Sequence, residues 1–174
     1  MRTIRTKVYQ YDELPTQQAK DNAIEWYRDD VSSNFSTAWD DIKEDAKQIG
    51  LKLISLDDHR ANEGDFMLSA NEVAQNIFNE HGESCSTYKT ATEFMENWQP
   101  VFNNYMDESH EDYESNESEE KLQELEDDFL HSLLEDYRIM YNQNVQAEYE
   151  DEYIIDILQA NNYEFTKDGK RFHS

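Results

Sequence analysis

Acidic side chains crowd the segment 107–128, where twelve of the twenty-two positions are Asp or Glu and Lys121 is the one Lys or Arg. On a helix, side chains three or four positions apart lie about 5–6 Å from one another on the same face. That spacing is close to the separation of successive phosphates along one strand of a duplex, which carries one charge per about 1.7 Å of axis over both strands. We therefore predict a phosphate-like row that binds a basic partner, made of Glu117, Glu120, Glu124, Asp127 and Asp128.

A second acidic cluster follows further along the chain, and we predict that it contacts the same kind of partner. Its candidate binding residues are Glu148, Glu150, Asp151 and Glu152, with Asp156 beside them. Both clusters have a second interpretation, which stays open: a solvated helix face that only keeps the protein in solution.

Two pairs of residues place a carboxylate and an imidazole one helical turn apart, Asp107 with His110 and Asp128 with His131. Helical di-metal sites use this spacing, but they also need inward carboxylates from other helices. Here both pairs stand in the most polar part of the chain. We expect no metal ligands, and keep a metal-binding helical protein as the third function considered.

Other chemical motifs are incomplete. A calcium loop around Gly64 would put His59 at its first ligand position, so the EF-hand pattern fails. His81 and Cys85 are four positions apart, but a lone pair makes neither a zinc site nor a nucleophile–base dyad. The sequence holds no Gly-rich phosphate loop and no nucleophile elbow. We expect no cofactor and no catalytic residue, and therefore no enzyme.

The charge balance limits the partners. Forty acidic residues stand against fifteen basic ones, giving a formal net charge of −25 and a pI near 4.3. Such a chain repels nucleic acid and anionic membrane surfaces, so we expect no direct nucleic-acid binding and no membrane contact. The expected partner is a basic host protein or nucleoprotein complex, and a homodimer stays open. One Cys and the lack of a signal-peptide pattern after Met1 favour the cytoplasm.

The helices and strands that would carry these acids are predicted from the spacing of apolar residues and from the Gly, Pro and capping residues that begin or end helices. Alternation predicts a strand over 3–9, and the Leu14–Thr16 segment opens a first helix. A polar link over 31–36 precedes a second helix, which starts near Ser36 or Thr37 and stops at Gly50. A strand over 51–55 follows directly, with a partner strand over 66–68 after a polar loop.

Helices dominate the rest of the chain. One runs from Ser69 to Gly82, and after a Ser/Thr loop another begins near Ala91 and is kinked or restarted at Pro100. A long helix keeps its apolar period from Leu122 to Met140, and a short one covers 151–160. Residues 163–165 read as a closing strand and 167–169 as a turn.

We therefore predict an α+β fold with several packed helices and a protruding acidic helix, in which a small antiparallel sheet holds both ends of the chain. We expect a single domain over 1–174. Within it, residues 1–70 form a strand-helix-helix-strand-strand unit, 70–150 are helical and acidic, and 151–174 add the closing helix and strand.

Two stretches carry a resemblance. Residues 8–20 read VYQYDELPTQQAK, ahead of a Trp-Tyr-Arg block at 26–28, and residues 160–169 read ANNYEFTKDG. In order and spacing they resemble a family of short, acidic, mostly uncharacterised proteins of tailed phages and prophages. The chain departs from that family over 61–68, where it lacks most of the expected glycines. The resemblance implies a mobile-element origin and, for some members, an anti-defence or antitoxin role.

Together these observations lead to one preferred function and one alternative from another class. The preferred function is an acidic inhibitor that occupies the nucleic-acid groove of a host defence complex by DNA or RNA mimicry, as anti-CRISPR and anti-restriction proteins do. The alternative is an antitoxin-like or regulatory protein that neutralises one basic protein without mimicry.

Overall fold

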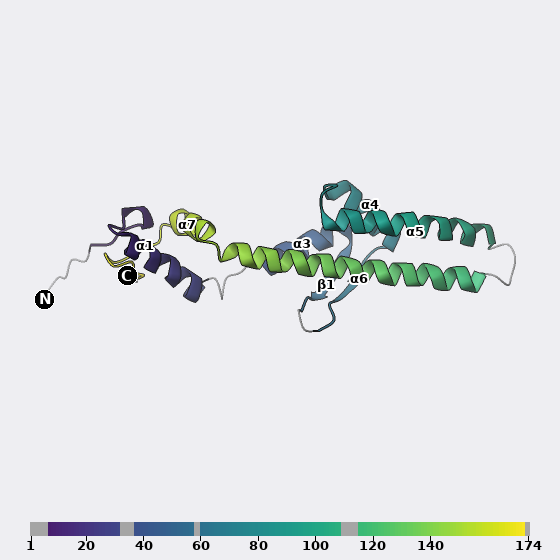
Figure 1. The fold of residues 1–174 in the computed structure, drawn as a ribbon, viewed down its shortest axis with the longest axis horizontal. Helices are drawn as coiled ribbons and strands as arrows, with labels where there is room; N and C mark the ends of the chain where they lie inside the picture. The colour runs from purple at the N-terminus through teal and green to yellow at the C-terminus, as the bar shows by residue number, and fades with distance from the viewer. Residues whose placement is uncertain (1–6, 32–36, 58–59, 109–114, 173–174) are drawn as a thin grey trace. The chain divides into compact units, whose positions relative to one another are not determined.

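The computed structural model describes residues 7–31, 37–57, 60–108 and 115–172. Most of the strand expected over 3–9 lies outside these ranges, as do residues 32–36 of the link expected over 31–36, His59 and His110. In chain order the elements are η1 (Tyr11–Glu13), α1 (Gln17–Trp26), η2 (Tyr27–Val31), α3 (Ala38–Ile49), β1 (Leu51–Ser55), β2 (Glu63–Phe66), α4 (Ala70–Glu80), α5 (Ser86–Glu108), α6 (Ser115–Glu148) and α7 (Asp151–Ala160) (Figure 1).

The internal contacts of the chain group into two compact units. Unit 1 comprises Met1–Ala38 and Asn142–Ser174, and unit 2 comprises Trp39–Tyr141. These ranges differ from the three segments expected from the sequence, because the end of α6 contributes to the unit that holds both termini. The single domain over 1–174 stays a prediction.

In unit 2, a β-hairpin follows α3 without a linker. Gly50 makes this junction with a φ of +90°, a conformation that side chains disfavour, and an added Cβ would stand 2.6 Å from Leu68 Cδ1. β1 pairs antiparallel with β2, with Leu51 opposite Phe66 and Leu53 opposite Gly64. The partner strand was expected over 66–68 and in fact covers 63–66. The antiparallel ladder aligns Gly64 against β1, where an added Cβ would stand only 2.6 Å from Leu134 Cδ2 of α6.

Helix α5 begins five residues earlier than expected and runs through Pro100 instead of restarting there. Its first turn includes Thr87, which is fully buried and within 2.7 Å of His81 Nδ1. Pro100 removes one backbone donor. Packing holds the helix on both sides of it, since the rings of Trp98 and Phe102 stack with centroids 4.5 Å apart.

The core of unit 2 lies between α3, the hairpin, α4, α5 and α6. Phe94 of α5 and Phe129 of α6 stack with centroids 4.1 Å apart and planes 6° from parallel. Trp98 Nε1 donates to the Glu126 carboxylate at 3.1 Å. The acidic half of α6 is therefore packed along α5 on one side, and Figure 1 shows the two helices running next to each other.

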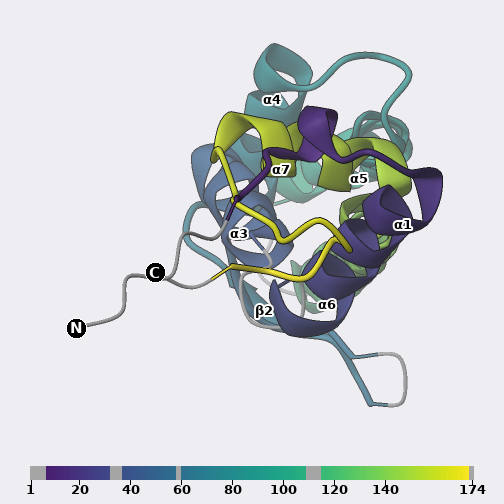
Figure 2. The same ribbon diagram turned by 90° about the vertical axis from the view of Figure 1, so that its left-hand side faces the viewer.

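Unit 1 joins the two ends of the described chain. Tyr9 and Phe165 exchange backbone hydrogen bonds of 2.9 and 2.8 Å, and Phe165 forms a second antiparallel bridge with Arg171. The purple N-terminal and yellow C-terminal segments accordingly lie side by side (Figures 1 and 2). Phe165 is fully buried beneath α1 and α7, with Trp26 at a ring distance of 5.8 Å. Gly169, with a φ of +82°, closes the turn, where a Cβ would stand 2.0 Å from the Ala19 carbonyl oxygen.

Helices with a small antiparallel sheet confirm the predicted α+β class. The prediction that this sheet holds both ends of the chain was wrong. In the described residues the sheet is the β1–β2 hairpin of unit 2, and the terminal segments pair through isolated bridges in unit 1. Among the helices described, none combines the length and the apolar character needed to cross a membrane.

Candidate functional site

The acidic row predicted on the long helix lies on α6 and faces outward. All five of its carboxylate residues are exposed: Glu117, Glu120, Glu124, Asp127 and Asp128. At about 100° per residue, they fall within an arc of about 100° around the helix axis. We call this set of five residues the acidic face.

The opposite side of the same helix segment fixes the direction of the acidic face. Leu122 and Leu125 are partly buried against the core, and Phe129 and Leu133 are buried within it. Around the helix axis, the centre of these four apolar residues lies roughly opposite the centre of the five carboxylates. Packing against α5 thus turns the five carboxylates to solvent, and it holds the helix without using any of their side chains in the core.

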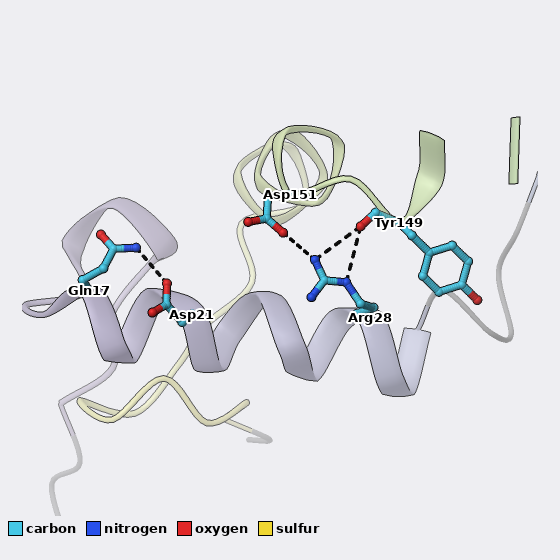
Figure 3. Close-up of polar contacts among 5 residues, drawn as sticks. All are labelled: Gln17, Asp21, Arg28, Tyr149 and Asp151. Carbon is cyan, nitrogen blue, oxygen red and sulfur yellow. Dashed lines mark hydrogen bonds and ion pairs between the residues drawn. The ribbon is translucent and has the colours of Figure 1, made fainter. Parts of the chain in front are cut away.

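The second acidic cluster is divided between fold contacts and exposed positions. Arg28 of η2 donates to the Tyr149 carbonyl at 3.3 Å and pairs with the Asp151 carboxylate (Figure 3). Asp151 and Glu152 also occupy the first turn of α7, where negative charge stabilises a helix. Glu150 and Glu152 are exposed and stay predicted contacts of a partner.

Glu148 is the predicted site residue that the structure places inside the protein. It is 8% exposed, and its Oε1 accepts hydrogen bonds from the backbone N–H groups of Thr37 (3.0 Å) and Ala38 (3.2 Å). These donors stand at the start of α3, so the carboxylate caps that helix from a distance in sequence. Glu148 therefore stabilises the fold, and its placement leaves it little surface to offer a partner.

A polar network in unit 2 has the composition of a hydrolytic triad. His81 Nδ1 lies 2.7 Å from Thr87 Oγ1, and His81 Nε2 lies 3.5 Å from Asp45 Oδ2. The same Asp45 oxygen accepts from the Tyr137 hydroxyl at 2.7 Å. Burial, with the Asp45 charge adding to it, raises the pKa of Tyr137 far above its usual value. Thr87 and Tyr137 are fully buried, so their hydroxyls are not exposed to a substrate. The network joins α3, α5 and α6 to the residue that follows α4.

The other pairs singled out in the sequence, the His81–Cys85 pair and the carboxylate–imidazole pairs, do not form a dyad or a metal cluster in the described residues. Cys85 is exposed and His81 is turned into the network above, so the pair does not meet as a dyad. Among the described residues, no three His, Cys, Asp or Glu side chains gather closely enough to hold a metal ion. Asp128 and His131 do line one cleft between α5 and α6, together with Glu93.

Sequence reasoning missed Glu93, because it lies outside the acid-rich segment. Its neighbour Phe94 begins an apolar stripe, which marks the buried face of α5 and places Glu93 at its border. This apolar stripe is the sequence feature from which the position of Glu93 beside the core could have been predicted.

Comparison with known proteins gave no match among family models, curated proteins or solved structures.

Proposed function

We propose that this protein is a phage-type acidic inhibitor that binds the basic nucleic-acid groove of a host defence complex and excludes the nucleic acid. One observation carries the proposal: five carboxylates of α6 share one exposed face while the opposite face is packed. The proposal includes that the protein acts by binding and not by catalysis, in the compartment where the host complex works.

The geometry of the acidic face supports mimicry. From Glu117 to Asp128 the helix rises about 16 Å at 1.5 Å per residue. Over the same axial length one strand of a duplex presents about five phosphates, at 3.4 Å per step. The acidic face offers five carboxylates over that distance. A groove built to bind successive phosphates would therefore meet a similar linear charge density.

The packing of α6 supports it as well. An isolated helix of like charges is destabilised, because carboxylates three and four positions apart repel one another. Here stacked aromatic rings and the Trp98–Glu126 hydrogen bond hold the helix against α5. The charges are thus held in place before binding, which lowers the ordering cost of association. The net charge of −25 would also speed the encounter with a cationic surface.

An antitoxin-like or regulatory protein is the second candidate, and a specific observation favours it. Unit 2 also exposes large apolar side chains, with Ile54 on β1 at 46% and Met67 after β2 at 49% exposure. A groove that binds phosphates makes few apolar contacts, whereas the core of a specific protein interface is rich in them.

Competition with nucleic acid distinguishes the mimicking inhibitor from the antitoxin-like or regulatory protein. The partner is captured from a phage-host lysate, identified by mass and purified. It is then bound to the immobilised protein at about 0.05 M salt, where the screening length is about 14 Å by square-root scaling from about 10 Å at 0.1 M. Duplex DNA or guide-type RNA is then added in increasing amounts. The proposal predicts release of the partner by nucleic acid, with a midpoint that rises with the amount of inhibitor. Retention that is indifferent to nucleic acid rejects mimicry in favour of the antitoxin-like alternative.

A further inference from the structure

A cleft between α5 and α6 lies beside the acidic face. Its volume is about 280 Å³, and it combines a buried apolar floor with exposed carboxylates from both helices. Phe94 and Phe129, exposed by 5% and 3%, contribute to the floor together with Leu125. Glu93 from α5 and Asp128 from α6 are exposed lining residues. Asp128 belongs to the acidic face, so the cleft continues that surface.

The size of the cleft limits what it can hold. Pockets for small molecules and cofactors usually measure about 300–1,000 Å³, and this cleft is just below that range. It is therefore better suited to one long side chain of a partner than to a metabolite.

The charge of the lining selects a cation. Glu93 and Asp128 bring two negative charges from opposite helices, and even a protonated His131 leaves the lining negative. The apolar floor, however, has little to offer a small hydrated ion. A side chain with an apolar stem and a charged end satisfies both parts, because the stem covers apolar surface while the end reaches the carboxylates.

We propose that this cleft receives an arginine side chain of the partner. The inference rests on the proposed function for the identity of the partner, and adds which side chain is recognised and where. Arginine fits better than lysine for two reasons. Its planar guanidinium can donate to two carboxylates at once and is less strongly hydrated than an ammonium, and it packs favourably on aromatic rings such as those of Phe94 and Phe129.

The test uses blocked arginine (Nα-acetyl-arginine amide) as the probe and the full chain, labelled with ¹⁵N and followed by NMR titration. Blocked lysine and blocked citrulline, the neutral analogue of arginine, are the control probes. Blocked arginine is expected to shift the amides of α5 and α6 that border the cleft, lysine to bind more weakly, and citrulline to bind least. Glu93→Gln and Asp128→Asn should each weaken arginine binding by about two- to fivefold, as loss of one exposed charge pair does.

Matched variants separate the cleft from general charge. Glu96→Gln on α5 and Glu119→Gln on α6 remove the same charge outside the cleft and outside the acidic face, and they should leave arginine affinity unchanged. Equal loss in all four variants, or equal binding of citrulline, overturns the inference. Failure of the proposed function looks different: arginine still shifts the cleft, but the captured partner is indifferent to nucleic acid. Glu93→Gln tests the cleft without changing the acidic face, because Glu93 lines the cleft and is not part of that face.

Discussion

Phe165→Ala should remove a large share of the stability of unit 1. Phe165 is fully buried and packs against Trp26, and it makes both bridges that hold the terminal segments together. Truncating a buried Phe costs about 3–5 kcal/mol. At about 0.05–0.15 kcal/mol per residue, a unit of about 70 residues is stable by only about 4–11 kcal/mol. The substitution therefore removes from about a quarter to all of that stability.

Hydrogen exchange followed by mass spectrometry measures this effect in each unit separately. In Phe165→Ala, amides of α1, α7 and the closing segment should exchange faster, while those of α4 and α5 in unit 2 keep their rates. Tyr149→Ala is the matched control, because this aromatic side chain of unit 1 is 39% exposed and should cost little. Unchanged exchange in α1 and α7, or an equal increase in both units, would refute the assignment of Phe165 to a core of its own.

Two further predictions concern the buried carboxylate of Glu148 and the partly buried carboxylate of Asp136. Glu148→Ala should destabilise the protein by about 1.5–3 kcal/mol, because the backbone donors of Thr37 and Ala38 lose a charged acceptor; Glu148→Gln keeps an acceptor and should cost less in urea unfolding, so equal costs would contradict the capping role. Burial raises the pKa of Asp136 despite its hydrogen bonds from Thr90 and Ser86. Stability from this group is therefore lost as pH rises through the folded pKa, and Asp136→Asn should raise the urea midpoint at pH 7 by more than near pH 3; an equal gain at both pH values would count against the raised pKa.

Most helices could be predicted because local signals set their ends. Thr16 accepts a hydrogen bond from the backbone N–H of Ala19 at the start of α1, and Ser69 forms a reciprocal capping box with Glu72 at the start of α4. Gly50 has the positive φ that a helix stop needs. The exposed acidic face also followed from the sequence, because the apolar period of α6 fixed which side would be buried.

Features that depend on distant contacts could not be predicted. The position of β2 depends on the close approach of Leu134 to Gly64, and the early start of α5 on the contact between Thr87 and His81. Glu148 looked like one more surface acid, since nothing near it in sequence shows that it caps a helix more than a hundred positions away. The cleft at Glu93 exists only because α5 packs along α6, a pairing that periodicity does not specify.

The central claim is that the acidic face of α6 is what the partner binds, and its affinity after neutralisation tests this most directly. The test variant carries Gln or Asn at all five positions of the acidic face. A control variant carries the same five-charge change at exposed acids outside both acidic clusters: Glu25, Glu63, Glu80, Glu83 and Glu96. Binding of both to the purified partner is measured over a range of salt concentrations.

The account predicts that the test variant loses most of its affinity and much of its salt dependence, while its fold is kept or becomes more stable as repulsion along α6 is relieved. The control variant should lose only the smaller, general effect of net charge. Equal affinities of the two variants would contradict the claim, because the interface would then not depend on where the charges stand.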